Sequence, residues 1–255
     1  MTANGNTIES QAQLDRMLSE ENVTLGDRSY RYERKFLIEN SRPQSVEGVV
    51  HLHPASFYRI YWPRFINNIY LDTSRFVNYR NAVDGSANRL KARIRWYGDL
   101  FSPSCSPRFE IKGKDGYVSY KSVYPLKDFD FARGIDTLCI SNLLDTSELS
   151  SEIRCYLAYT RPVLVNRYQR KYWRSRDGRY RLTLDHNISY SGFSSFENQN
   201  LQSYVEATSV ILEIKYNLTE DLHFADIANQ FPFRQSRSSK YVAGIDQIYQ
   251  LGNYY

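Results

Sequence analysis

Several short segments of the chain alternate between polar, mostly charged, residues and apolar residues. Residues 89–96 read RLKARIRW, in which every odd-numbered residue is basic and every even-numbered one is apolar. Related patterns with a period of two occur in residues 31–36, 108–112, 179–185 and 210–216. Successive side chains of a β-strand point to opposite faces, so each segment is predicted to be a strand with one charged face. Like charges placed opposite one another on neighbouring strands repel, so we expect an anion on the shared face.

Two arrangements would satisfy this pattern: an open sheet whose basic surface binds nucleic acid, or a barrel with a cationic interior and an apolar exterior under helices. The strands of a membrane barrel also alternate between polar and apolar residues, but the intervening helical patterns and the lack of a visible signal sequence argue against a membrane barrel. Carboxylates decide between the first two, because Glu33, Glu110, Asp185 and Glu213 share the basic faces. They would repel a nucleic-acid backbone, yet they could hold Mg²⁺ or Mn²⁺ beside phosphate oxygens. The pattern therefore favours a polyphosphate site, and no nucleic-acid partner is expected.

The rest of the chain has the composition of an ordinary globular protein. It has 255 residues, 24% of them charged, with a net charge of +5, and its 22 Tyr residues favour strands. Residues 1–28 are predicted to be a polar tail or short helix, and residues 29–255 one domain. Helices are predicted for residues 57–65, 140–159 and 222–230, and loops for 102–107 and 191–200.

Other common kinds of site find no support in the sequence. There is no P-loop motif, and no His and Cys residues have zinc-site spacing. His51 and His53 are interpreted as loop or surface residues, and the three cysteines as free thiols. No stretch approaches the roughly 20 apolar residues of a membrane-spanning helix, and the N-terminus lacks the apolar core of a signal peptide. We therefore expect a cytoplasmic protein without a transmembrane segment.

Nine motifs, in order between about Ser29 and Gly244, resemble the polyphosphate polymerase domain of the vacuolar transporter chaperone (VTC) family. That family belongs to the triphosphate tunnel metalloenzymes, together with the CYTH phosphatases, and the likeness is to short stand-alone bacterial forms. The motifs are YERKFLI (32–38), IYLDT (69–73), LKARIRWYG (90–98), FEIKGK (109–114), YKSVY (120–124), RPVLVNRYQRKYW (161–173), RLTLD (181–185), LEIKY (212–216) and SRSSKYVAG (236–244).

The resemblance implies an α+β fold in which about eight antiparallel strands form a β-barrel tunnel with a basic lumen, flanked by helices. It implies an enzyme that transfers the γ-phosphate of ATP to inorganic polyphosphate with Mn²⁺ or Mg²⁺. Hydrolysis of triphosphates in the same tunnel and non-catalytic polyphosphate binding are the alternatives. The first strand carries Arg31 where CYTH members have a glutamate, which weakens the case for a triphosphatase.

Carried over motif by motif, the resemblance also implies a set of site residues. The catalytic residues would be Lys35, Arg93, Arg95, Arg170, Arg181 and Lys240. Further phosphate contacts would come from Lys112, Lys121, Tyr168, Arg237, Ser239 and Lys215. Glu213 would hold the metal, with Asp185 and Glu33 as further candidates. Arginine forks fit phosphate oxygens in a bidentate manner, and lysines supply point charges.

Overall fold

The computed structural model describes residues 31–115, 118–193, 203–206 and 209–251. These ranges contain nine strands, six α-helices and a short 3₁₀ helix. In chain order they are β1 (Arg31–Ile38), α2 (Pro43–Leu52), β2 (Tyr58–Asp72), α3 (Val77–Val83), β3 (Arg89–Tyr97), β4 (Arg108–Asp115), β5 (Val118–Pro125), α4 (Thr137–Thr146), α5 (Ser151–Ala158), β6 (Arg161–Arg174), β7 (Arg181–Gly192), β8 (Ser203–Glu206), β9 (Val210–Asn217), η1 (Leu218–Glu220), α6 (Asp221–Ala228) and α7 (Lys240–Tyr249).

Eight of the strands form one hydrogen-bonded path in the order β1-β9-β7-β6-β2-β3-β4-β5, and β8 pairs with β7 beside that path. The pairs with a described register, such as β1 with β9 and β3 with β4, are antiparallel. An antiparallel sheet of eight strands with flanking helices confirms the predicted α+β class and strand number. All five segments predicted from alternation correspond to strands, namely β1, β3, β4, β7 and β9, although β7 begins at Arg181 and not at residue 179.

The described chain forms two compact units. The first comprises residues 69–96 and 101–163, and therefore α3, β4, β5, α4, α5 and all of β3 except Tyr97. The second comprises residues 31–68, 97–100 and 164–251, with β1, β7, β9, α2, α6 and α7. The predicted boundary after residue 28 lies outside the described residues.

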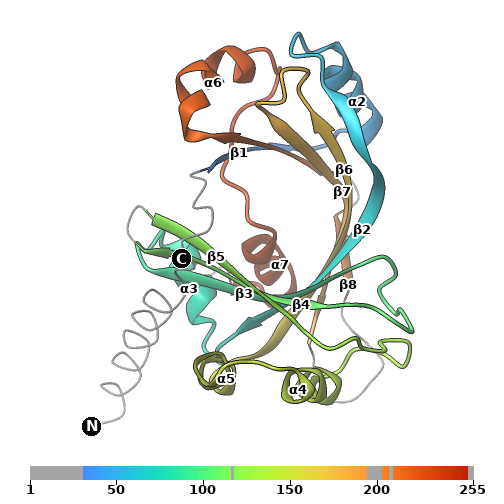
Figure 1. Cartoon of the computed structure of the whole chain (residues 1–255), viewed down its shortest axis with the longest axis vertical. Helices are drawn as coiled ribbons and strands as arrows, with labels where there is room; N and C mark the ends of the chain where they lie inside the picture. The colour runs from blue at the N-terminus through green and yellow to red at the C-terminus, as the bar shows by residue number, and fades with distance from the viewer. Residues whose placement is uncertain (1–30, 116–117, 194–202, 207–208, 252–255) are drawn as a thin grey trace. The chain divides into compact units, whose positions relative to one another are not determined.

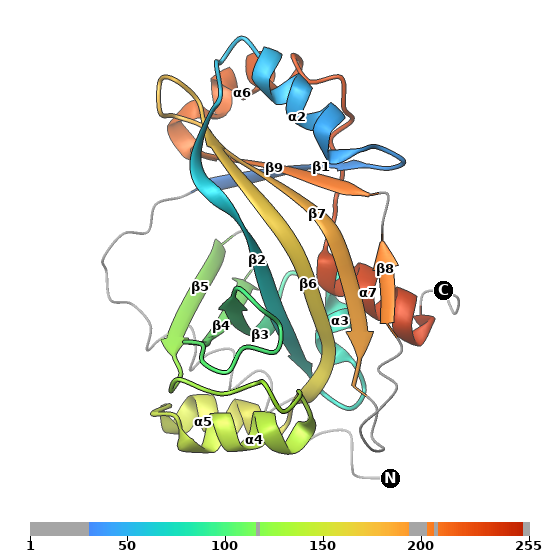
Figure 2. The same cartoon turned by 90° about the vertical axis from the view of Figure 1, so that its right-hand side faces the viewer.

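The core of the second unit lies on the apolar face of β1, β7 and β9. Leu182 and Ile214 are fully buried there, in one cluster with Val46 and Val50 of α2 and Phe224 of α6. Figure 2 shows α2 and α6 close to these strands. The apolar phase of the alternation therefore lies under helices in this unit, as the barrel arrangement predicted.

Helix α7 packs closely on β6 and β7 of the second unit. A Cβ atom at Gly244 would lie 2.5 Å from Leu164 Cδ2 and 2.6 Å from Tyr190 Cδ1, so any larger residue would force these side chains to shift. This glycine ends the SRSSKYVAG motif, and its packing fixes the helix whose first residue is Lys240.

In the first unit the apolar face of the strands is buried as well. Ile94 and Ile111 are fully buried, and Trp96 stacks on Phe131 with ring centroids 4.6 Å apart. Figure 1 shows α4 and α5 side by side near β3, β4 and β5. Residues of α4 and α5 contribute to the buried interior, among them Ile140 and Ile153.

Two of the three helix predictions need correction or refinement. The helix predicted for residues 57–65 is wrong, because residues 58–65 begin β2. Its aromatic and β-branched residues favour a strand, and pairing within the sheet outweighed the helical spacing. The helix predicted for 140–159 is divided into α4 and α5, since Ser147 and Ser150 have extended backbones. The helix predicted for 222–230 is confirmed by α6.

His53 lies in the bend that follows α2, as predicted for a loop residue, but it is not at the surface. Its ring is buried and stacks on Phe231 with a centroid distance of 4.3 Å. Nδ1 accepts a hydrogen bond from the Ala55 amide at 3.1 Å, and Nε2 lies 3.1 Å from the Ile227 carbonyl oxygen. The three cysteines are free, as predicted. Within the described ranges, no helix combines the length and the apolar character needed to cross a membrane.

Candidate functional site

In the second unit, the register of β6, β7, β9 and β1 places charged residues in rows across the sheet. Directly opposite residues share a face of the sheet, so each row is a set of side-chain neighbours. One row is Arg174, Arg181, Lys215 and Glu33, and the next is Tyr172, Thr183, Glu213 and Lys35. In a third row, Arg170 lies opposite Asp185. Predicted site residues from four strands are thereby brought together.

Two carboxylates and two lysines form a quartet on β1 and β9. The Nζ atom of Lys35 lies 2.8 Å from Glu33 Oε1 and 3.8 Å from Glu213 Oε2. That of Lys215 lies 2.6 Å from Glu213 Oε1 and 3.8 Å from Glu33 Oε2. Burial alone would raise the pKa of Glu213, but the surrounding cations, with Lys215 foremost, hold it well below the ordinary value. Glu213 is therefore an ionised, buried carboxylate at neutral pH.

This quartet has the donors that a divalent cation needs. Mg²⁺ is commonly bound by one or two carboxylates together with phosphate oxygens of a substrate, and Mn²⁺ accepts the same oxygen ligands. Across the described ranges, no group of three or more His, Cys, Asp or Glu side chains is arranged to hold a metal. Glu213 and Glu33 thus fit a metal that also has phosphate ligands, rather than one enclosed by protein ligands alone.

Asp185 lies fully buried between two of the predicted cations. Its Oδ1 accepts from Arg170 Nε at 2.5 Å, and its Oδ2 accepts from Arg170 Nη2 at 2.7 Å and from Lys240 Nζ at 2.5 Å. The ring of Tyr168 lies beneath both cations, with Lys240 Nζ 4.6 Å and Arg170 Cζ 5.3 Å from its centroid. Both carboxylate oxygens are thus engaged, and Asp185 holds Arg170 and Lys240 together. The metal role predicted for Asp185 stays a prediction.

The segment before α7 is held against β1. The amide of Ser236 donates to the Lys35 carbonyl, and the Ser236 hydroxyl accepts from the Leu37 amide, both at 2.8 Å. Ser239 caps α7 by accepting from the Val242 amide. Arg237 is exposed between them and has no ion pair with any described residue. The phosphate contacts predicted for Ser239 and Arg237 stay predictions.

A cavity of about 340 Å³ opens in the second unit beside these rows. Its lining includes the predicted site residues Arg170, Arg181 and Lys215. Arg181 is exposed and has no ion pair within the part of the chain that is described. The sequence did not single out Tyr61 and Tyr172, which line the same cavity.

The first unit carries a second cationic cluster, on β3, β4 and β5. Lys91, Lys112 and Lys121 lie directly opposite one another across the three strands. The neighbouring row places Arg93 opposite Glu110. Three lysines in one row repel each other, so this face is stabilised by any anion that binds to it.

Glu110 is the buried anion at the centre of this cluster. Its Oε2 accepts from Arg93 Nε at 2.8 Å and lies 3.7 Å from Arg95 Nη1, and its Oε1 accepts from Lys121 Nζ at 2.8 Å. Burial alone would raise the pKa of Glu110, but the adjacent cations, led by Arg93, lower it to about 2. The alternation placed Glu110 on the basic face, but the motifs assigned it no role.

The predicted residues therefore form two clusters, one in each unit. Lys35, Arg170, Arg181, Lys215, Lys240 and the metal candidates belong to the second unit, and Arg93, Arg95, Lys112 and Lys121 to the first. The single enclosed lumen predicted from the alternation stays a prediction.

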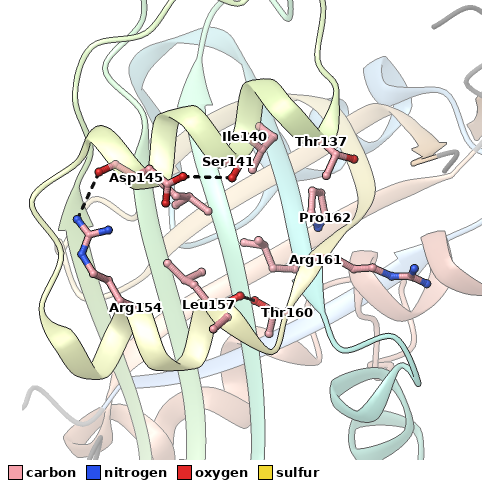
Figure 3. A pocket seen from close by; sticks show the side chains of 12 residues that line it. Thr137, Ile140, Ser141, Asp145, Arg154, Leu157, Thr160, Arg161 and Pro162 are labelled. Atoms are coloured by element: carbon pink, nitrogen blue, oxygen red, sulfur yellow. Dashed lines mark hydrogen bonds between the residues drawn. The ribbon is translucent and has the colours of Figure 1, made fainter. Parts of the chain in front are cut away.

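Another cavity, of about 290 Å³, lies in the first unit between α4, α5 and the start of β6 (Figure 3). Arg154 Nη2 donates to the Ser147 carbonyl at 2.7 Å beside it, and Ser141 donates to Asp145 at 3.3 Å. None of the predicted site residues lines this cavity.

Comparison with known proteins identifies one domain family. The model of the VTC domain matches residues 30–249. A solved structure from Vibrio parahaemolyticus, described as a candidate adenylate cyclase, is 11% identical with a TM-score of 0.47, and covers 84% of this chain and 98% of its own. A solved structure of a protein from Pyrococcus horikoshii is 13% identical with a TM-score of 0.47, and the match covers 85% of this chain and 99% of the other. No curated protein matches the sequence significantly.

Proposed function

Because this chain belongs to the VTC domain family, we propose that it is a metal-dependent polyphosphate polymerase using ATP. The family is one of triphosphate tunnel proteins, and its members usually act on triphosphates. The finer activity, transfer of the ATP γ-phosphate to a growing polyphosphate chain, is our proposal.

One observation carries the proposal: a buried, ionised carboxylate adjoins a cavity with several cations. Glu213 contacts Lys215, which lines the cavity together with Arg170 and Arg181. Binding of an anion alone requires only the cations. A carboxylate kept ionised among them cancels part of their positive charge, and a divalent cation bound to it would restore the attraction for phosphate. The arrangement thus supports catalysis with a metal over simple polyphosphate binding.

The residues of the chain fit the needs of phosphoryl transfer, which mainly requires positioning and neutralisation of charge. A terminal oxygen of the polyphosphate attacks the γ-phosphorus of ATP, the bond to the β,γ-bridging oxygen breaks, and ADP leaves. Arg170 is held by Asp185 through Nε and Nη2, so its Nη1 donors remain for a phosphate oxygen. Arg181 and Lys215 add charge at the same cavity.

Glu213 and Glu33 would hold the Mn²⁺ or Mg²⁺ ion. When bound, the ion supplies positive charge between phosphate oxygens and stabilises the charge that develops during transfer. The two lysines of the quartet, Lys35 and Lys215, already neutralise these carboxylates in the protein alone.

The direct test is incubation of the full chain with ATP and Mn²⁺, followed by a gel that separates polyphosphates by length. We expect a ladder of polymer with wild-type protein, its loss with a chelator, and near loss in Glu213→Gln, which keeps the side-chain shape and removes the charge. Glu39→Gln, at an exposed site in the turn after β1, is the matched control and should behave as wild type.

The same assay separates the alternatives. Release of orthophosphate from ATP or tripolyphosphate without polymer would indicate a hydrolase, and binding without turnover would indicate a non-catalytic module. Turnover of Glu213→Gln equal to that of wild type would remove Glu213 from the site.

A further inference from the structure

The cavity of the second unit is lined by aromatic rings as well as by cations. Tyr61 and Tyr172 contribute to its wall, together with Arg170, Arg181 and Lys215. A bare polyphosphate chain presents only charged oxygens, which can accept a hydrogen bond from a tyrosine hydroxyl but do not stack on the face of the ring. The mixed lining suits a ligand with an anionic part and a flat, apolar part.

The two rings form a fixed corner. Their centroids are 5.6 Å apart and their planes are perpendicular, the edge-to-face geometry that aromatic pairs favour. Arg64 holds Tyr172 in place, since its Nε donates to the Tyr172 hydroxyl at 3.1 Å and its Cζ lies 5.0 Å from the ring centroid. The same guanidinium lies 4.9 Å from the ring centroid of Tyr97.

Tyr61 is the member of this corner that is open to a ligand. It is 57% exposed, although it packs against Tyr172 and lies within 5.7 Å of Arg64 Cζ. An exposed ring whose orientation is fixed by its neighbours loses little conformational freedom when a second ring stacks on it.

We propose that Tyr61, held by Tyr172 and Arg64, stacks on the base of a nucleoside triphosphate whose phosphates are bound by Arg181, Lys215 and Arg170. The inference rests on the proposed function and deepens it, because it makes the cavity selective for nucleotides over bare triphosphate. Stacking uses the face that every base has, so the site distinguishes poorly between ATP and GTP.

The test compares the affinity of the full chain for two ligands by calorimetry at fixed ionic strength. The ligands are the non-hydrolysable β,γ-imido analogue of ATP and tripolyphosphate. Tyr61→Ala should weaken binding of the nucleotide about tenfold, as expected for loss of one base-stacking contact, and change that of tripolyphosphate by less than about twofold. Tyr61→Phe keeps the ring and should bind both ligands as wild type does.

Trp62→Ala is the matched control, because Trp62 is an 85% exposed aromatic residue on the same strand that does not line the cavity. It should leave both affinities unchanged. Unchanged nucleotide affinity in Tyr61→Ala, or an equal loss for both ligands, would overturn the stacking proposal and leave the proposed function standing. Failure of the wild-type chain to bind either ligand would overturn the proposed function itself, and the stacking site with it.

Discussion

The replacement of Glu110 by Gln should destabilise the protein by an amount that depends on pH. The carboxylate of Glu110 is only 6% exposed and contacts Arg93, Arg95 and Lys121. The ordinary pKa of a glutamate is 4.5, whereas that of Glu110 is about 2. One pH unit corresponds to about 1.4 kcal/mol, so the ionised form contributes about 3 kcal/mol to the free energy of unfolding.

The sign of the pH dependence follows from the lowered pKa. The stabilisation is fully present above the pKa of the unfolded chain, and it is lost as the pH falls towards the pKa of the folded state. Gln cannot ionise and resembles the protonated acid. The difference in free energy of unfolding between wild type and Glu110→Gln should therefore be about 3 kcal/mol at about pH 7, and shrink between about pH 5 and pH 2.

The assay is urea-induced unfolding of both proteins at several pH values, with the two compared at each pH. Glu148→Gln, at an exposed glutamate of the same unit that has no ion pair with a described residue, is the control and should change stability little. The reasoning would be refuted by equal stability of Glu110→Gln and wild type at neutral pH. A difference that stays constant down to about pH 3 would also refute it, because it would not come from the charge of Glu110.

Three further predictions concern the ligand, the buried ion pair and α7. Tripolyphosphate at about a hundred times its Kd should add about 2.7 kcal/mol to the free energy of unfolding and raise the Tm, whereas sodium chloride of matched ionic strength should do less; equal shifts would contradict specific binding. Asp185→Asn should lower the free energy of unfolding, measured in urea, by about 3–5 kcal/mol, because Arg170 and Lys240 lose their buried counter-ion. A decrease of less than about 1 kcal/mol would contradict this prediction. Gly244→Ala should lower the Tm and reduce the free energy of unfolding by about 1–3 kcal/mol, because the added methyl group collides with neighbouring side chains. Gly48→Ala in α2, where nothing lies within 4 Å of the added methyl group, should raise the Tm; a higher Tm for Gly244→Ala than for Gly48→Ala would contradict the packing of α7.

Much of the fold could be predicted from local patterns. The alternation in residues 89–96 predicted both a strand and its basic face, since successive side chains of any strand point to opposite sides whatever it pairs with. The same reasoning predicted that the apolar faces of the strands lie under helices, and Leu182 and Ile214 on these faces are buried. Where the local pattern was ambiguous, as in residues 57–65, pairing within the sheet decided the outcome, and the expected helix is part of β2.

The sequence by itself determined which residue types lie on the charged faces, but only the tertiary structure decided which of them meet. Arg170, Asp185 and Lys240 come from β6, β7 and α7, and their contacts depend on strand register and on the packing of Gly244. The sequence showed Glu110 as one carboxylate on a basic strand. Its low pKa is produced by Arg93 and other cations, and their proximity to Glu110 depends on strand pairing that the sequence does not reveal. The corner formed by Tyr61 and Tyr172 had no signal in the sequence, because its two rings lie on strands far apart in the chain. Periodicity is a local property of the backbone, whereas register, burial and charge environment arise from contacts between distant segments.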